Sequence, residues 1–343
     1  MIKIFSILLI NNFLIFIKLK KLSKIINIFD KPDNHLKKHK SNVPLLGGII
    51  VAANLFILSF SMIFFENLFG YFIVSKKEFA SIIFFCASFF ILGIYDDKFI
   101  LNPDKKFIIS IIFSILSLTL NKNLLIDSFN LSFYEKKIIL NDFSFFFTLF
   151  CIIILINALN FYDGINGQSL IFFIVVFSYL CLNSPLQTFY FVLIFICVFI
   201  LFLNLKNKIF LGDSGVYLLG SIVIVLLIYE YNVFKTIKFA DEIFLLLILP
   251  GVDLLRLTIM RITNGKNAFY GDRNHIHHML IRKFSLITSN TILLILAVFP
   301  MTLLMVFKLN FFISFISFLI LYVLSILFLK LNNKKNNNKK KIR

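Results

Sequence analysis

The chain has 343 residues, of which 59% are hydrophobic and 15% are charged, and its formal net charge is +18. This composition excludes an ordinary soluble enzyme, in which about a quarter of the residues carry charge. Apolar stretches of about 20 residues recur along the chain, which is the length that crosses a hydrocarbon core as a helix. A β-barrel would show shorter, alternating segments. The composition therefore predicts an all-α polytopic membrane protein.

The positive charge does not indicate nucleic-acid binding, because no recognition module accompanies it. Most of the 35 Lys and Arg residues flank the apolar stretches. Positive residues in such loops mark the cytoplasmic side of a membrane and attract anionic lipids. We therefore expect a lipid bilayer, and no nucleic acid, as the partner of these charges.

Apolar stretches predict a bundle of about eleven transmembrane helices, and Asn11 and Asn12 interrupt the first. The predicted spans are 2–17, 45–66, 79–95, 107–121, 143–160, 169–183, 186–204, 215–230, 242–260, 289–307 and 311–329.

An odd number of spans places the two termini on opposite sides of the membrane. The bias of Lys and Arg then predicts an N-terminus outside and a C-terminus in the cytoplasm. Residues 1–330 are expected to form a single integral-membrane domain, and residues 331–343 a basic, disordered cytoplasmic tail.

Polar residues gather in clusters at span ends that this topology places on the cytoplasmic side. The clusters are Asp30–Gly48, Gly93–Lys106, Asn157–Gly167, Gly212–Gly215 and Arg256–Arg282. Polar groups near the membrane are costly and are usually kept for function. The pattern therefore predicts an enzyme with an active-site cleft on the cytoplasmic face.

Two of these clusters carry oxygen ligands. The adjacent carboxylates of Asp96 and Asp97 repel each other unless they share a proton or a cation. Magnesium, which binds carboxylate and phosphate oxygens together, is the natural candidate. Asn157, Asn160 and Asp163 follow at spacings of three, which on a helix places them on one face. Their side chains end an apolar run and need a partner such as a metal or a nucleotide.

Asp213 lies in a Gly- and Ser-containing segment just before the eighth span. Helix N-termini present free backbone N–H groups and favour phosphate. The alternative interpretation is that Asp213 only caps this helix.

Three of the five histidines, His275, His277 and His278, follow Arg273. Zinc binding is one interpretation, but neither a cysteine nor a third ligand at suitable spacing supports a closed site. A solvated basic loop is another. Arg and His donors around a diphosphate fit better, because Arg matches phosphate oxygens bidentately. The five clusters together favour phosphoryl-type transfer between a nucleotide and a lipid, which depends on positioning and charge neutralisation.

In order and spacing these residues resemble the polyprenyl-phosphate N-acetylhexosamine-1-phosphate transferases. The segments that carry the resemblance are GIYDD (93–97), NALNFYDGING (157–167), GDSG (212–215) and HIHH (275–278). HIHH and the preceding Gly-Asp-Arg resemble the UDP-GlcNAc:undecaprenyl-phosphate GlcNAc-1-phosphate transferase branch. The family fold is a bundle of ten or eleven spanning helices and is often dimeric, so a homodimer is a further expectation.

The resemblance implies transfer of a HexNAc-1-phosphate, with GlcNAc first, from a UDP-sugar to undecaprenyl phosphate. The products are undecaprenyl-diphosphate-HexNAc and UMP, and the reaction would begin a cell-surface glycan such as an O-antigen. It implies a Mg²⁺ cofactor, with Mn²⁺ as an alternative, and a location in the bacterial cytoplasmic (inner) membrane.

Carried onto this chain, the resemblance implies three groups of site residues. The catalytic residues would be Asp96, Asp97, Asp163 and Asp213, and Asp213 and Asn160 would be the metal ligands. The substrate-binding residues would be Lys38, His39, Lys106, Asn157, Arg273, His275, His277 and His278.

Three alternatives stay open at this point. The donor could carry another amino sugar or phospho-MurNAc-pentapeptide. A transporter would need polar groups inside broken spans, and Pro250, Gly251 and Asp253 in the ninth predicted span are the main residues of that kind. The third alternative is a non-catalytic membrane scaffold, which would not bind a complex of magnesium and a UDP-sugar.

Overall fold

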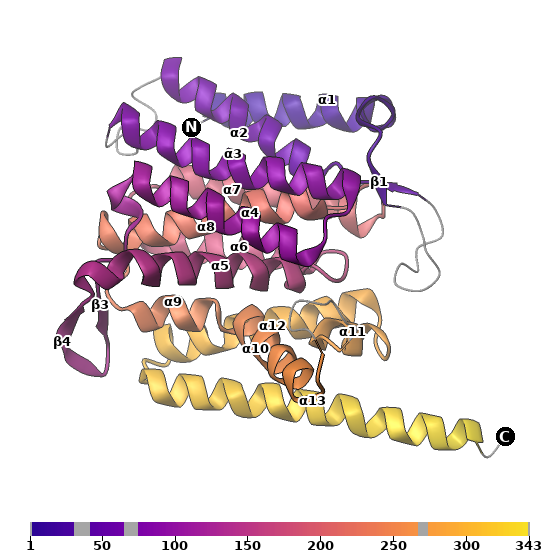
Figure 1. The fold of residues 1–343 in the computed structure, drawn as a ribbon. Coiled ribbons are helices and arrows are strands. Elements are labelled where there is room, and N and C mark those ends of the chain that lie inside the picture. Colours follow the sequence, from indigo (N-terminus) through magenta and orange to yellow (C-terminus); the bar gives the residue numbers. More distant parts are fainter. Residues whose placement is uncertain (1, 31–41, 65–74, 267–273, 342–343) are drawn as a thin grey trace. The chain divides into compact units, whose positions relative to one another are not determined.

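The computed structural model describes residues 2–30, 42–64, 75–266 and 274–341. Helices dominate these residues, and the strands form only two two-stranded sheets (Figure 1). The predicted all-α membrane fold is therefore confirmed. The chain divides into two compact units. The first comprises Met1–Ser128 and Ile139–Thr236, and the second Phe129–Ile138 and Ile237–Arg343.

In the first unit, long apolar helices lie side by side as a bundle (Figure 1). They are α1 (Ile2–Ile26), α2 (Gly47–Phe64), α3 (Lys76–Phe99), α4 (Pro103–Leu120), α5 (Ser144–Tyr162), α6 (Gln168–Asn183), α7 (Gln187–Leu205) and α8 (Gly212–Asn232). Short elements join them: β1 (Phe29–Asp30), β2 (Val43–Pro44) and the 3₁₀ turns η2 (Lys122–Leu124) and η3 (Asn141–Phe143). β1 and β2 pair antiparallel.

The second unit contains the remaining helices and a β-hairpin in the segment after α4. Its elements are β3 (Ser128–Leu131), β4 (Tyr134–Ile139), α9 (Ala240–Leu246), α10 (Ile248–Thr263), α11 (Ile276–Ile281), α12 (Leu286–Met305) and α13 (Phe311–Lys341). The Asp241 carboxylate at the start of α9 accepts hydrogen bonds from the backbone N–H and the hydroxyl of Ser132 in the hairpin. The predicted cytoplasmic tail, residues 331–343, stays a prediction.

Every predicted span coincides with a helix, but the ninth is two helices, α9 and α10, bent by 71°. By length and composition, six helices of the described residues can cross a membrane, or seven if the bent pair is one span. The predicted number of eleven is not confirmed on this measure. One reason is length, because α6 has only 16 residues.

α8 lies at the centre of the first unit and packs against α2, α3, α5 and α6. Its residues from Ser214 to Tyr231 are all buried. A helix that is apolar on every face is expected in the interior of a protein. This packing holds buried polar residues near the two ends of α8, such as Ser214 and Glu230, in place.

Glycines bring α2, α3 and α8 into backbone contact where α8 begins. A Cβ atom on Gly93 of α3 would lie 2.4 Å from the Cα atom of Ser214. A Cβ atom on Gly48 of α2 would lie 2.4 Å from the backbone N of Gly215. No side chain fits at either position, and this close approach places the end of α3 beside the start of α8.

Polar side chains inside the bundle find partners on other helices. Asn54 of α2 donates to Asn12 over 2.9 Å and accepts from Asn11 over 3.2 Å, so the two amides that interrupt the first predicted span are paired. The buried Glu230 of α8 accepts hydrogen bonds from Ser184 over 2.5 Å and from Tyr190 over 2.6 Å. Such pairing offsets the cost of burying polar groups in an apolar bundle.

We expect Gly93→Ala to destabilise the protein, because its methyl group must push α3 away from the backbone of α8. The matched control is Gly251→Ala in α10, where a Cβ atom meets nothing within 4 Å. Thermal unfolding in detergent should show a melting temperature lower by about 5 °C or more for Gly93→Ala. The control should be neutral or more stable, since Ala favours a helix over Gly by roughly 1 kcal/mol. Equal melting temperatures would contradict the backbone contact.

Candidate functional site

The first unit brings three of the predicted polar clusters together at one end of its bundle. Asp96 and Asp97 lie in the last turns of α3, and Lys106 lies in the first turns of α4. Asn160 ends α5, and Asp213 begins α8. Because consecutive helices run in opposite directions, these helix ends meet, as the sequence analysis expects.

An ion-pair bridge connects two of the carboxylates. The Lys106 ammonium forms ion pairs with Asp96 and with Asp213, whose Oδ2 lies 3.2 Å from Nζ. Asp96 also accepts a hydrogen bond of 2.7 Å from the N–H of Leu101 and is almost fully buried. The Asp213 side chain keeps 32% of its surface exposed, against 2% for Asp96. Asp213 is therefore the carboxylate of this bridge that a ligand can reach.

The electrostatics of Lys106 reflect this bridge. Burial lowers the pKa of its ammonium, but the negative charges of Asp213 and Asp96 outweigh burial, so the pKa lies above its ordinary value. Lys106 therefore stays protonated at neutral pH.

Asp97 has a different role from that of its neighbour. Its carboxylate accepts a hydrogen bond of 2.8 Å from the N–H of Asp213 and one of 3.1 Å from the N–H of Ser214. It thus caps the N-terminus of α8, where a negative charge is stabilised by the free N–H groups and the helix dipole. Gly212, in the left-handed region with φ of 74°, leads the chain into this capped turn. With both oxygens engaged, Asp97 fixes the position of Asp213.

The end of α5 adds an amide and a fourth carboxylate. Asn160 donates a hydrogen bond of 3.1 Å to the hydroxyl of Tyr217, one turn after Asp213 on α8. Burial raises the pKa of Asp163 to about 7, and the negative charge of Asp213 acts in the same direction. Asn157 donates to the carbonyl of Ile153 within its own helix, over 2.7 Å. Of the three predicted residues, Asn160 and Asp163 are therefore the two tied to the surroundings of Asp213.

The donors at this end of the bundle suit a divalent cation. Lys106 pairs with the carboxylates of Asp96 and Asp213, and the carboxyl groups of Asp97 and Asp163 lie close to Asp213. Burial is the main cause of the raised pKa of Asp163, and the negative charge of Asp213 adds to it. Carboxylate and amide oxygens are the hard ligands that Mg²⁺ and Mn²⁺ prefer. The residues present therefore fit such an ion.

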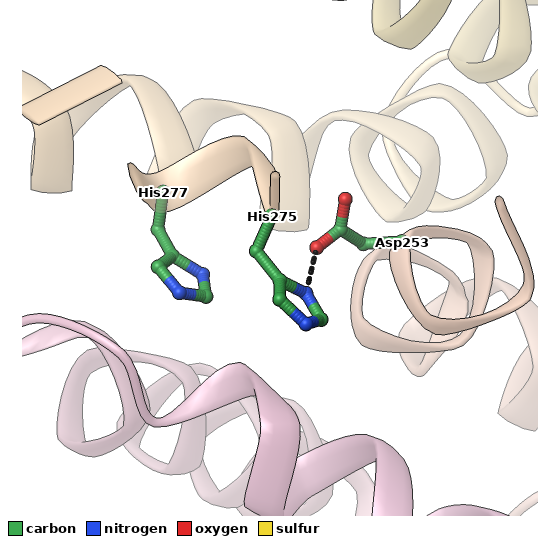
Figure 2. Close-up of side chains that lie close together, drawn as sticks. All are labelled: Asp253, His275 and His277. Atoms are coloured by element: carbon green, nitrogen blue, oxygen red, sulfur yellow. Dashed lines mark hydrogen bonds and ion pairs between the residues drawn. The ribbon is translucent and has the colours of Figure 1, made fainter. Parts of the chain in front are cut away.

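A second polar cluster lies in the second unit and contains the predicted His275, His277 and His278. His275 Nδ1 lies 2.8 Å from Oδ2 of Asp253, and the His277 ring lies parallel to that of His275 (Figure 2). All of Asp253, His275 and His277 are buried. His278 contacts both other imidazoles edge-on. Burial holds the pKa of His277 well below its usual range, and the neighbouring histidines add to this effect, so His277 is neutral at physiological pH.

The donor atoms of Asp253, His275 and His277 lie within 4.8 Å of one another, a spacing that a metal could bridge. Two guanidinium groups oppose a cation there. Arg256 Nη2 lies 2.7 Å from Asp253, and Arg261 Nη2 lies 3.4 Å from the His275 ring. With one carboxylate against two guanidiniums, this cluster favours an anion. The prediction that these histidines serve an anionic substrate gains support over zinc.

Three predicted site residues fall outside the part of the chain that the structure describes, and two residues of the second cluster were not predicted. Lys38, His39 and Arg273 lie outside the described residues. Asp253 and Arg256 belong to this cluster but were not among the predicted site residues, although an ionisable residue inside a predicted span is itself a signal of function. Asp253 was considered only for the transporter alternative.

The chain is similar to known proteins over the part that contains this site. Residues 79–230 match the family model described as glycosyl transferase family 4, and this range contains Asp96, Lys106, Asn160, Asp163 and Asp213. A protein of Escherichia coli O157:H7 is 30% identical over 276 residues, covering 77% of this chain and 71% of the relative.

Two further relatives match over similar lengths. One from Salmonella typhi is 30% identical over 294 residues, covering 82% and 76%, and one from Haemophilus influenzae is 28% identical over 286 residues, covering 79% and 76%. All three relatives are named undecaprenyl-phosphate alpha-N-acetylglucosaminyl 1-phosphate transferase. The motifs, the clustered carboxylates and this similarity together show that the chain belongs to glycosyl transferase family 4.

Proposed function

We propose that this protein transfers GlcNAc-1-phosphate from UDP-GlcNAc to undecaprenyl phosphate at a membrane surface. The products would be undecaprenyl-diphosphate-GlcNAc and UMP, which initiates a cell-surface glycan. The single observation that carries the proposal is the Asp213 carboxylate, held at the N-terminus of α8 by Asp97 and Lys106 in a chain of this family. The names of the relatives supply the donor and the acceptor.

In the proposed reaction an oxygen of the lipid phosphate forms a bond to the phosphorus that carries the sugar. The bond from this phosphorus to the bridging oxygen of UMP breaks, and UMP leaves with that oxygen. The attacking phosphate is already an anion and a nucleophile, so the protein need not remove a proton from it. Its task is to hold two negatively charged reactants together, which depends on positioning and neutralisation of charge.

Asp213 and Asn160 would hold the divalent cation, Mg²⁺ or Mn²⁺, with Asp163 nearby. When bound, the ion would neutralise charge on the diphosphate. Lys106 would contact phosphate oxygens, since its ammonium lies beside Asp213 and stays protonated. Asp97 is a positioning residue in this scheme, because its oxygens bind the backbone of α8.

The second unit would bind the anionic sugar nucleotide through its histidines and arginines. The buried His275 and His277 and the guanidinium of Arg256 supply hydrogen-bond donors and acceptors there, and one carboxylate offsets their charge. We further propose that the protein lies in the bacterial inner membrane with its N-terminus outside and its C-terminus in the cytoplasm. The distribution of Lys and Arg supports this orientation.

The activity is tested with purified protein, undecaprenyl phosphate and a panel of UDP-amino sugars, with UMP release as the readout. We expect release with UDP-GlcNAc that requires both the lipid and a divalent cation. Chelation with EDTA should abolish release, and added Mg²⁺ or Mn²⁺ should restore it, because the carboxylates need a counter-ion to bind a diphosphate. Release of UMP only with another UDP-amino sugar would show that this sugar, and not GlcNAc, is transferred. Movement of substrate across the membrane of proteoliposomes without release of UMP would support the transporter alternative.

Asp213→Asn and Asp97→Asn should separate ligand binding from positioning. Asp213→Asn should lower kcat by about 100-fold or more, as expected for loss of a charged group at the reacting phosphates, without lowering the melting temperature. Asp97→Asn should lower both kcat and the melting temperature, because its amide group opposes a backbone N–H of α8 and loses a cap worth about 1 kcal/mol. An active Asp213→Asn protein would count against the proposed site.

The raised pKa of Asp163 predicts a dependence of stability on pH. The pKa of about 7 means that the folded protein holds a proton on Asp163 up to about pH 7, whereas the unfolded chain releases it near the ordinary pKa of 3.8. The folded state therefore loses stability from Asp163 as pH rises through this range. Melting temperatures of EDTA-treated protein between pH 5 and pH 8 should fall less steeply for Asp163→Asn than for the unsubstituted protein. Parallel curves would show that Asp163 does not hold this proton.

A further inference from the structure

Asp253 of α10 connects the other polar residues of the second unit. Its Oδ1 accepts hydrogen bonds from Arg256 over 2.7 Å and from the hydroxyl of Tyr322 over 2.6 Å. Its Oδ2 lies 2.8 Å from Nδ1 of His275, and the N–H of Ile276 at the start of α11 lies 3.3 Å from Oδ1 (Figure 2). One carboxylate thus contacts side chains of α10 and α13 and the segment that enters α11.

This geometry determines which ring nitrogen of His275 carries its proton. A carboxylate only accepts hydrogen bonds, so Nδ1 facing Asp253 must be protonated. On the other side of the ring, Nε2 lies 3.4 Å from the guanidinium of Arg261, which only donates. An unprotonated Nε2 can accept a hydrogen bond from this guanidinium. The hydrogen-bond network therefore selects the Nδ1–H form of the imidazole, as carboxylate partners of functional histidines commonly do.

Arg256 is fixed by the same carboxylate. Besides its bond to Asp253, its Nε donates to the Tyr322 hydroxyl over 2.8 Å and its Nη2 to the carbonyl of Asn274 over 2.8 Å. Asn274 directly precedes His275. Arg256 and His275 are therefore held relative to each other through Asp253 and through the backbone between them.

The cost of this arrangement indicates that it does more than join helices. Asp253 is 1% exposed, within a segment apolar enough to be part of a span. An ion pair buried this deeply is often no more stabilising than apolar packing of the same volume. A carboxylate in such a place is better explained by the groups that it orients.

We propose that Asp253 is a positioning residue for sugar-nucleotide binding: it sets the proton position and ring orientation of His275 and the place of Arg256, and so prepares this segment to bind the diphosphate. The identity of the ligand rests on the proposed function, but the orientation of His275 does not.

The first test compares Asp253→Asn with the matched control Tyr322→Phe. Asn keeps the shape of Asp but cannot accept from both His275 and Arg256. Phe removes the hydroxyl that donates to Asp253 and accepts from Nε of Arg256, and it leaves the contacts of Asp253 with His275 and with Nη2 of Arg256. For Asp253→Asn we expect the KM for UDP-GlcNAc to rise by about 10- to 100-fold, as for loss of a buried charged partner. The KM for undecaprenyl phosphate should change by less than about twofold. Tyr322→Phe should change either constant by less than about threefold.

The split between the two KM values separates positioning from a merely structural role. Unchanged KM values in Asp253→Asn would overturn the proposal. So would an equal rise in both, accompanied by a lower melting temperature, because that is the result of general loosening of the unit.

The second test needs no activity and decides the proposal even if the protein releases no UMP from any donor. The ¹⁵N spectrum of histidine-labelled protein reports the protonation of each ring nitrogen, and the chain has only five histidines. His275→Gln identifies the signals of His275. We expect a protonated Nδ1 for His275 in the unsubstituted protein and in Tyr322→Phe, and a population with Nε2–H in Asp253→Asn. An identical His275 signal in Asp253→Asn would overturn the proposal. Absence of UMP release together with the expected spectra would refute the proposed function alone.

Discussion

The candidate site of the first unit depends on the contact between the end of α3 and the start of α8. Gly93 lets the two backbones approach so closely that no side chain fits between them. Asp97, one turn further along α3, then reaches the first N–H groups of α8 and caps them. The cap in turn directs Asp213 toward Lys106. Packing, capping and the position of a charged ligand group are thus consequences of a single backbone contact.

Around that contact carboxyl groups outnumber positively charged groups. Lys106 bridges Asp96 and Asp213, and the carboxyl groups of Asp97 and Asp163 lie close to Asp213. Carboxylates packed together in an apolar bundle repel one another unless a proton or a cation compensates them. The divalent ion that we propose for this site would supply such a charge.

In the cluster of the second unit, positively charged groups outnumber carboxylates. Arg256 pairs with the Asp253 carboxylate, Arg261 lies beside the ring of His275, and the neutral His277 adds no charge. Its bend of 71° between α9 and α10 precedes Asp253, and the break in the helix is the feature that the sequence analysis linked with a transporter. In this structure the polar residue near the break binds His275 and Arg256. The charged residue that follows the break is therefore paired within its own unit.

Local sequence was sufficient for the helices and for most of the site residues. Apolar runs predict helices because each run can satisfy its own backbone in lipid, and charged motifs mark where such runs end. Gly93–Lys106, Asn157–Gly167 and Gly212–Gly215 were expected at one end of the bundle for this reason, and α3, α4, α5 and α8 do end and begin there. The number of spans was less well predicted, because short helices such as α6 carry the same local signal as full spans.

Contacts between helices that are distant in the sequence determine the partner of each site residue. Asp96 and Asp97 are neighbours with the same chemistry, but one pairs with Lys106 and the other caps α8 through a contact between residues 116 positions apart. His275 and Asp253 are 22 positions apart, so no spacing rule links them. Residue type and helical period specify which groups are available and where a helix ends. The partner of each group depends on which helices touch, and this is a property of the folded chain.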